Sequence, residues 1–85
     1  MKVRYTRLFI KDFEKLPDQI KKRTTFVIDA IKEVNTLREI KNCASLKGYE
    51  NAYRIRIGDY RIILTNEIDT IIFNRVTSRG EAYKN

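Results

Sequence analysis

Hydrophobic and charged side chains alternate over residues 53–57, and a second, mainly hydrophobic run follows over residues 60–64. Such alternation places successive side chains on opposite faces of a β-strand. The two runs are separated only by a Gly-Asp pair at positions 58–59, and a glycine at the first central position suits the type II′ turn of a two-residue hairpin loop. The pattern therefore predicts a hairpin in which Arg56 lies opposite Arg61.

This register divides the side chains of the hairpin between two faces. Arg54, Arg56 and Arg61 share one face, because directly paired residues point the same way. Like charges that oppose each other across strands destabilise a sheet. A face that binds a ligand therefore explains the three arginines better than a face that is merely exposed to solvent, which stays the alternative interpretation. The opposite face is hydrophobic and should pack on the core, its two tyrosines included. It consists of Tyr53, Ile55, Ile57, Tyr60, Ile62 and Leu64.

The N-terminal part of the chain predicts a short strand followed by two helices. Residues 2–5 form the strand, Thr6 is a suitable N-cap for the first helix, and Pro17 ends that helix. A second amphipathic helix is expected from Asp18 to about Asn35. The inward-facing positions of the two helices are Phe9, Phe13, Leu16, Ile20, Thr24, Val27, Ile31 and Val34.

The rest of the chain completes an α+β pattern. Residues 36–51 lack a clear period, so we expect a loop with room for one helical turn. Residues 66–69 predict a turn and residues 70–76 the last strand, whose hydrophobic run is typical of a central position. We therefore predict one domain over residues 1–85 with the element order β-α-α-β-β-β. Its sheet should be mostly antiparallel, with an αα-hairpin packed on one face.

Composition and charge narrow the class of function. The chain has 18 Lys and Arg residues against 11 Asp and Glu, a net charge of +7 and a pI near 9.8, which favours a polyanionic partner such as nucleic acid or an acidic protein. It has no His, and its one cysteine, Cys43, leaves no internal disulfide and no zinc site. We find no signal-peptide core or transmembrane run, so we expect a cytoplasmic protein without a membrane partner, with Cys43 half-buried in a loop.

Three segments together resemble the RelE/ParE superfamily of bacterial toxins from toxin–antitoxin modules. They are Leu46-Lys47-Gly48, the hairpin segment from Tyr53 to Ile63, and Arg79-Gly80-Glu81-Ala82-Tyr83. The predicted order of elements matches as well, so the resemblance covers nearly the whole chain. It implies one of two activities, because members of the RelE branch cut mRNA in the ribosomal A site and members of the ParE branch act on DNA gyrase. Both branches are neutralised by a cognate antitoxin.

The RelE resemblance also implies a reaction and a set of site residues. A ribose 2′-OH attacks the adjacent phosphate, which requires a base, cations for the developing phosphorane charge and an acid for the leaving 5′-oxygen, but no metal or other cofactor. By alignment Tyr83 would stack on or hydrogen-bond to the nucleotide. Arg61 is expected to hold the phosphate, since a guanidinium can bind two phosphate oxygens at once. The cations that the alignment implies are Arg54, Arg56, Arg61 and Arg79.

The sequence departs from the family at the proton acceptor. RelE-type enzymes carry Lys at the positions of Arg54 and Arg56. An arginine cannot replace a lysine as the base, because its pKa is too high for it to lose its proton. Other members use a His nearby, and the strand position that could hold one is Asn74. The remaining candidates for the base are Glu81 and Tyr83, although Glu81 could instead pair with Arg79 as a solvated carboxylate. Lys47 precedes the hairpin by several residues, so we expect it to bind RNA rather than to accept the proton.

Three hypotheses for the function therefore stay open. The leading one is a ribosome-dependent mRNA endoribonuclease that inhibits translation, with the ribosome, mRNA and an acidic antitoxin as partners. The second is a DNA gyrase inhibitor without nuclease activity, and the third is a catalytically decayed member that binds only an antitoxin or RNA. The basic segment at residues 21–23 is expected to be a solvated helix face, with contact to ribosomal RNA or gyrase as the alternative.

Overall fold

The helices and strands follow the predicted order, with one addition. The computed structural model describes residues 1–78 of the chain. The 3₁₀ turn η1 and the strand β2 both fall within residues 36–51, where we expected a loop with room for one helical turn. The elements are β1 (Lys2–Tyr5), α1 (Arg7–Glu14), α2 (Asp18–Glu33), η1 (Leu37–Glu39), β2 (Cys43–Ser45), β3 (Ala52–Ile57), β4 (Tyr60–Glu67) and β5 (Thr70–Ser78).

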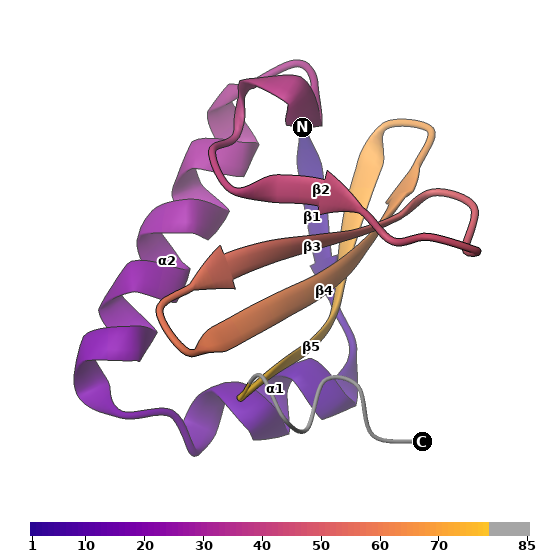
Figure 1. The fold of residues 1–85 in the computed structure, drawn as a ribbon. Coiled ribbons are helices and arrows are strands. Elements are labelled where there is room, and N and C mark those ends of the chain that lie inside the picture. The colour runs from indigo at the N-terminus through magenta and orange to yellow at the C-terminus, as the bar shows by residue number, and fades with distance from the viewer. Residues whose placement is uncertain (79–85) are drawn as a thin grey trace.

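The strands form one five-stranded sheet in the order β1-β5-β4-β3-β2. All neighbours are antiparallel except β1, which runs parallel to β5. Helix α2 runs along one side of this sheet, and α1 lies across the end of β5 (Figure 1). The predicted α+β class, the helical pair and the mostly antiparallel sheet are therefore confirmed.

The short edge strand β2 corrects the expectation of a loop. It has only three residues and pairs with β3, Cys43 lying opposite Ile55 and Ser45 opposite Tyr53. Three residues are too few to display a period in the sequence, and the strand is held by the ladder that β3 offers along its open edge. Cys43 thus lies in a strand rather than in a loop, although it is half-buried as expected.

Thr6 links the start of α1 to the sheet. Its side chain accepts a hydrogen bond from the backbone of Phe9 at 3.1 Å, as predicted for an N-cap, and its hydroxyl donates to the carbonyl of Asn74 at 2.9 Å. Phe9 is 2 % exposed. Its ring lies 5.3 Å from that of Phe73 and 5.7 Å from that of Tyr5, measured between centroids, so the helix is packed on β5 at its first turn.

Helix α2 ends two residues earlier than the sequence pattern predicted. Val34 is extended, and the backbone nitrogen of Met1 donates to the carbonyl oxygens of Ile31, Lys32 and Val34 at 3.0–3.3 Å. Carbonyl groups at the end of a helix lack partners within it, and the residue that precedes β1 supplies a donor here. The buried hydrophobic core comprises Phe9, Leu16, Ile28, Ile31, Leu37, Ile55, Ile57, Ile62, Leu64, Ile71, Phe73 and Val76.

The last two strands are longer than predicted. Strand β4 continues to Glu67 and β5 to Ser78, so the turn between them shortens to residues 68–69. Ile71 and Phe73 of β5 are fully buried, in keeping with the expected central position, because β5 lies between β1 and β4. Among residues 1–78, no helix has the length and apolar character needed to cross a membrane.

Asp12 of α1 binds the part of β5 that extends beyond its pairing with β1. Its carboxylate accepts hydrogen bonds from Nε of Arg75 at 2.7 Å, from Nη2 of Arg75 at 3.2 Å and from the backbone N–H of Val76 at 3.1 Å. Arg75 of β5 is thereby paired with an acidic side chain of α1. A charged acceptor that also binds a backbone donor makes a stronger contact than an exposed ion pair.

We expect Asp12→Ala to lower the free energy of unfolding by about 1–3 kcal/mol, because it leaves the Val76 N–H without its acceptor. The matched control is Asp29→Ala, which removes only an exposed pair with Lys32 at 3.9 Å and should change stability by roughly 0–1 kcal/mol. Urea unfolding of both variants measures the difference. Equal loss of stability in the two would contradict the role of Asp12 at the edge of β5.

Candidate functional site

The hairpin adopts the register that the sequence predicted. Gly58 has a positive φ of 57°, which a glycine tolerates without strain, and the turn pairs Ile57 with Tyr60 and Arg56 with Arg61. The side chains then separate as expected. Ile55, Ile57 and Ile62 are at most 2 % exposed on the core side.

We refer to Arg54, Arg56 and Arg61, which share the other face of the hairpin, as the arginine cluster. Arg56 is exposed, Arg54 is half-buried, and Arg61 is only 6 % exposed. Across the strands their neighbours include Ala44, Ile63 and Thr77, which carry no charge. No acidic residue stands at these cross-strand positions of β2, β4 and β5.

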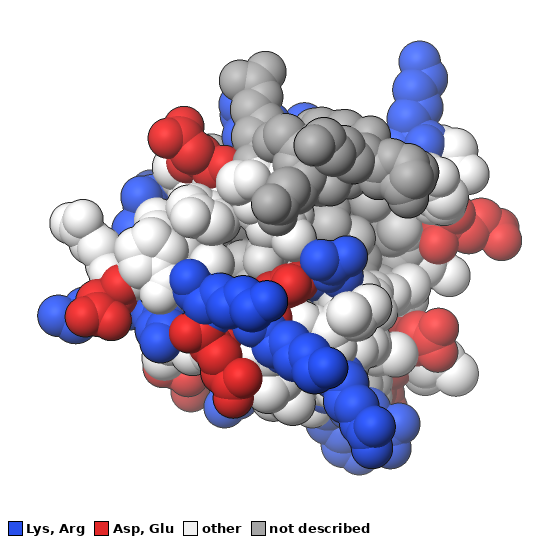
Figure 2. Space-filling model, turned by 90° about the horizontal axis from the view of Figure 1, so that it is seen from below, with Lys and Arg blue, Asp and Glu red and all other residues white. Residues whose placement is uncertain are grey.

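The charge pattern is different at the end of the molecule where α1 lies. There Lys and Arg side chains stand beside Asp and Glu side chains (Figure 2). Neighbouring charges of opposite sign largely cancel at a distance, so this surface offers less attraction to a polyanion than its number of basic residues suggests.

Thr77 is a polar neighbour of the arginine cluster that the sequence did not predict. It lies directly opposite Arg61 on β5 and is 5 % exposed. Within residues 1–78 its hydroxyl has no hydrogen-bond partner. The sequence predicts that the last strand ends at Val76, and only the observed pairing of β5 with β4 reveals the position of Thr77.

Neither Arg75 nor Asn74 supplies a base to this site. Arg75 is bound to Asp12 on α1, and the amide of Asn74 donates to the hydroxyl of Thr65. These residues lie at a bulge, where the pairing shifts between Ile63 and Leu64. The strand position that could hold a His therefore carries an amide, which cannot serve as a base.

The other predicted site residues do not join the cluster within the described part of the chain. Lys47 is exposed in the loop between β2 and β3, at the end of β3 that is opposite the hairpin turn (Figure 1). Ala52, next to this loop, lies four positions before Arg56 in β3. This spacing corresponds to a distance of roughly 13 Å along the strand. Arg79, Glu81 and Tyr83 lie outside the described residues.

Arg23 of α2 lies close to the hairpin turn, a position that sequence reasoning missed. A side-chain carbon added at Gly58 would lie 3.2 Å from Nη1 of Arg23. We expected residues 21–23 to be a solvated helix face, and Lys22 and Arg23 are indeed exposed. Nothing in the sequence relates position 23 to position 58, because the proximity arises only when α2 packs along the sheet.

Cys43 is not activated as a nucleophile. Burial raises the pKa of its thiol, and the positive charge of Arg54 opposes this effect without cancelling it. The thiol is therefore protonated at neutral pH, which leaves it a small apolar side chain at the edge of the sheet.

With the fold and the arginine cluster described, comparison with known proteins identifies the family. The family described as "ParE toxin of type II toxin-antitoxin system, parDE" matches residues 3–83. Toxin RelE3 of Methanocaldococcus jannaschii is 42 % identical over 84 residues, which cover 98 % of this chain and 96 % of that protein.

Solved structures agree with this relationship. A chain of the RelB-RelE antitoxin-toxin complex from Methanococcus jannaschii is 38 % identical and superposes with a TM-score of 0.86 over 94 % of both chains. A chain of the archaeal RelE-RelB complex from Pyrococcus horikoshii OT3 is 25 % identical, with a TM-score of 0.77 over 93 % of this chain and 94 % of the other. This chain therefore belongs to the RelE/ParE superfamily and is a RelE-like toxin of a type II toxin–antitoxin system.

Proposed function

We propose that this toxin is an endoribonuclease that cuts mRNA on the ribosome and so inhibits translation. The observation that carries the proposal is the direct pairing of Arg56 with Arg61, flanked by Arg54, on one sheet face. Opposed like charges cost a sheet roughly 0.2–1 kcal/mol. A polyanion that binds between these side chains removes the repulsion and adds charge-assisted hydrogen bonds, so the arrangement favours a bound nucleic acid.

The proposed reaction is attack by a ribose 2′-oxygen on the adjacent phosphorus, with cleavage of the bond from phosphorus to the 5′-oxygen. The 2′-hydroxyl proton passes to a base, and the leaving 5′-oxygen takes a proton from an acid. The products are a 2′,3′-cyclic phosphate and a 5′-hydroxyl end. Arg61 would stabilise the negative charge that develops on the phosphate oxygens, and Thr77, directly opposite, can donate a further hydrogen bond to them.

The remaining cations would position the RNA strand. Arg56 is exposed beside Arg61, and Arg54 follows two residues away on the same face, so both can bind phosphates of neighbouring nucleotides. Lys47, at the far end of β3, would bind the strand further along. Arg79 would add a cation near the reacting phosphate, and Tyr83 would stack on the base.

The arginine cluster cannot supply the proton acceptor, since an arginine does not lose its proton. We assign this role to Glu81 or to Tyr83. A carboxylate accepts the proton directly, whereas a tyrosine does so only if neighbouring arginines lower its pKa.

We further propose that a cognate acidic antitoxin binds this toxin and holds it inactive. The support is that two of the similar solved structures are complexes of a RelE protein with RelB. A segment of negative charge would be attracted to a chain of net charge +7.

Inhibition of DNA gyrase is the second candidate function. The match of residues 3–83 to the ParE family favours it, and so does the replacement of the hairpin lysines by arginines, which takes a possible base from the site. The third candidate is a catalytically decayed member that binds only an antitoxin or RNA. The absence of the hairpin lysines favours this candidate too.

We expect Arg61→Ala to slow the cleavage of mRNA on purified ribosomes roughly 10- to 100-fold, because it removes a contact of about 1.5–3 kcal/mol from the transition state. Arg61→Lys should recover only part of the rate, since the two-oxygen contact is lost. The control is Arg38→Ala, which removes the same charge from an exposed position in η1. Primer extension measures the rate, and thermal unfolding confirms that each variant is folded.

Two results would contradict the nuclease assignment. One is cleavage at the parental rate by both Arg61 variants. The other is intact mRNA together with inhibited DNA supercoiling, which would establish the gyrase function instead.

The two base candidates are separated by Glu81→Gln and Tyr83→Phe. General base catalysis contributes about 100- to 10,000-fold, so the substitution that removes the base should lower the rate by at least about 100-fold. Single-turnover cleavage on programmed ribosomes measures both. A loss below about tenfold in each variant would exclude both residues as the base.

We also expect the antitoxin encoded beside this gene to associate quickly at low salt and more slowly as salt is added. Screening shortens from about 10 Å at 0.1 M to about 3 Å at 1 M ionic strength, which weakens electrostatic steering. Stopped-flow mixing over a salt series measures the association rate. A rate that does not depend on salt would show that the charge of the toxin does not drive this encounter.

A further inference from the structure

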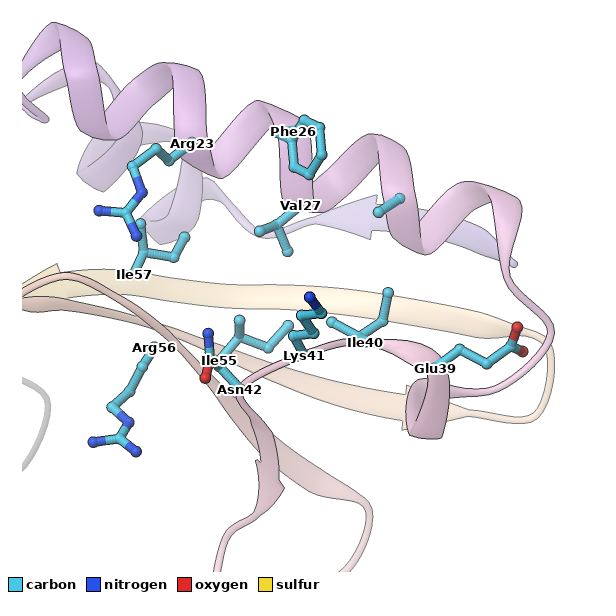
Figure 3. A pocket seen from close by; sticks show the side chains of 11 residues that line it. Arg23, Phe26, Val27, Glu39, Ile40, Lys41, Asn42, Ile55, Arg56 and Ile57 are labelled. Carbon is cyan, nitrogen blue, oxygen red and sulfur yellow. The ribbon is translucent and has the colours of Figure 1, made fainter.

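A pocket of about 440 Å³ opens between α2 and the segment that leads from η1 through β2 to β3 (Figure 3). This is large enough for small groups or side chains, since pockets that bind ligands measure about 300–1,000 Å³. The apolar residues that line it are Phe26, Val27, Ala30, Ile40, Ile55 and Ile57.

Phe26 is an exposed hydrophobic residue at the rim of this pocket. Its side chain is 76 % exposed, although other residues of the same helix are buried against the sheet. In Figure 3 its ring lies against α2, and the neighbouring Val27 points toward the strands. A partner that covers Phe26 would bury apolar area that the isolated chain leaves in water. An aromatic residue beside a pocket is also the usual anchor of a protein interface.

The charged residues of the rim are arranged unevenly. The pocket is lined by three basic residues, Arg23, Lys41 and Arg56, and by one acidic residue, Glu39. Arg23 and Arg56 lie toward the hairpin turn, and Glu39 lies at the opposite end (Figure 3). The pocket thus combines an apolar floor with a positive end.

We propose that this pocket receives apolar side chains of an acidic segment of the antitoxin, with carboxylates of that segment beside Arg23 and Arg56. The inference rests on the proposed antitoxin partner and names where on the toxin it binds. A second copy of the toxin would bring its own charge of +7 to a positive rim, which repels it. RNA could satisfy the arginines, but its sugar–phosphate chain is polar and charged, and the transfer of such groups into an apolar pocket without hydrogen-bond partners costs free energy.

This location also explains how binding would inhibit the toxin. Arg56 belongs both to the pocket rim and to the arginine cluster. A carboxylate that holds Arg56 removes it from the RNA, so occupation of the pocket and binding of mRNA exclude each other. The antitoxin need not reach the nearly buried Arg61 for this competition to occur.

Isothermal titration of the purified antitoxin encoded beside this gene tests the proposal without ribosomes or RNA. We expect Phe26→Ser to raise the Kd at least about tenfold, and Arg23→Glu to raise it similarly, because the charge reversal repels the acidic segment. The matched control is Leu8→Ser, which removes an exposed hydrophobic side chain, 55 % exposed, from α1 outside the pocket. Its Kd should stay within about twofold of the parent.

The outcomes separate this proposal from the proposed nuclease function. An unchanged Kd for both Phe26→Ser and Arg23→Glu, in variants that unfold at the parental temperature, would overturn the docking site whatever the nuclease activity. A self-associated parent that becomes monomeric in Phe26→Ser while its Kd for the antitoxin is unchanged would also overturn it, in favour of a second copy. Weakened binding in a toxin that cuts no mRNA would support the docking site and refute the nuclease.

Discussion

The two-residue turn at Gly58-Asp59 sets the register on which both the core and the arginine cluster depend. Because side chains alternate along a strand, a slip by one residue would turn the buried isoleucines of β3 outward and bring Arg54 and Arg56 into the core. Removal of a charged guanidinium from water costs several kcal/mol unless it is paired. The hydrophobic face and the cationic face therefore enforce the same alignment, and the positive charge of the arginine cluster also protects the strands against mispairing.

The features that could be predicted from the sequence are those determined by nearby residues. A glycine in the right position of a short turn fixes the pairing of Arg56 with Arg61, and the side chain of Thr6 fixes the start of α1. The α+β class follows from the change of hydrophobic period along the chain. Each of these patterns involves only a few consecutive residues, so it can be recognised without knowledge of the rest of the structure.

The features that escaped prediction arise from contacts between distant parts of the chain. Thr77 becomes the neighbour of Arg61 only because β5 pairs with β4 beyond Val76. Arg23 approaches the hairpin turn only because α2 packs along the sheet. Strand β2 is too short to carry a pattern and exists because β3 offers it a ladder. Three of the predicted site residues, Arg79, Glu81 and Tyr83, lie beyond residue 78, so their place in the site is still a prediction from the sequence.

The parallel pairing of β1 with β5 has a consequence for synthesis of the chain. β1 is made first, but its partner in the sheet is the last strand, and Thr6 is bonded to a residue 68 positions later. Pairing over such separations forms slowly. The aromatic side chains of β1 and α1 therefore stay exposed to solvent until β5 has left the ribosome and inserted between β1 and β4. A ribosome that makes this toxin must therefore pass residue 78 before β1 can be joined to the rest of the sheet.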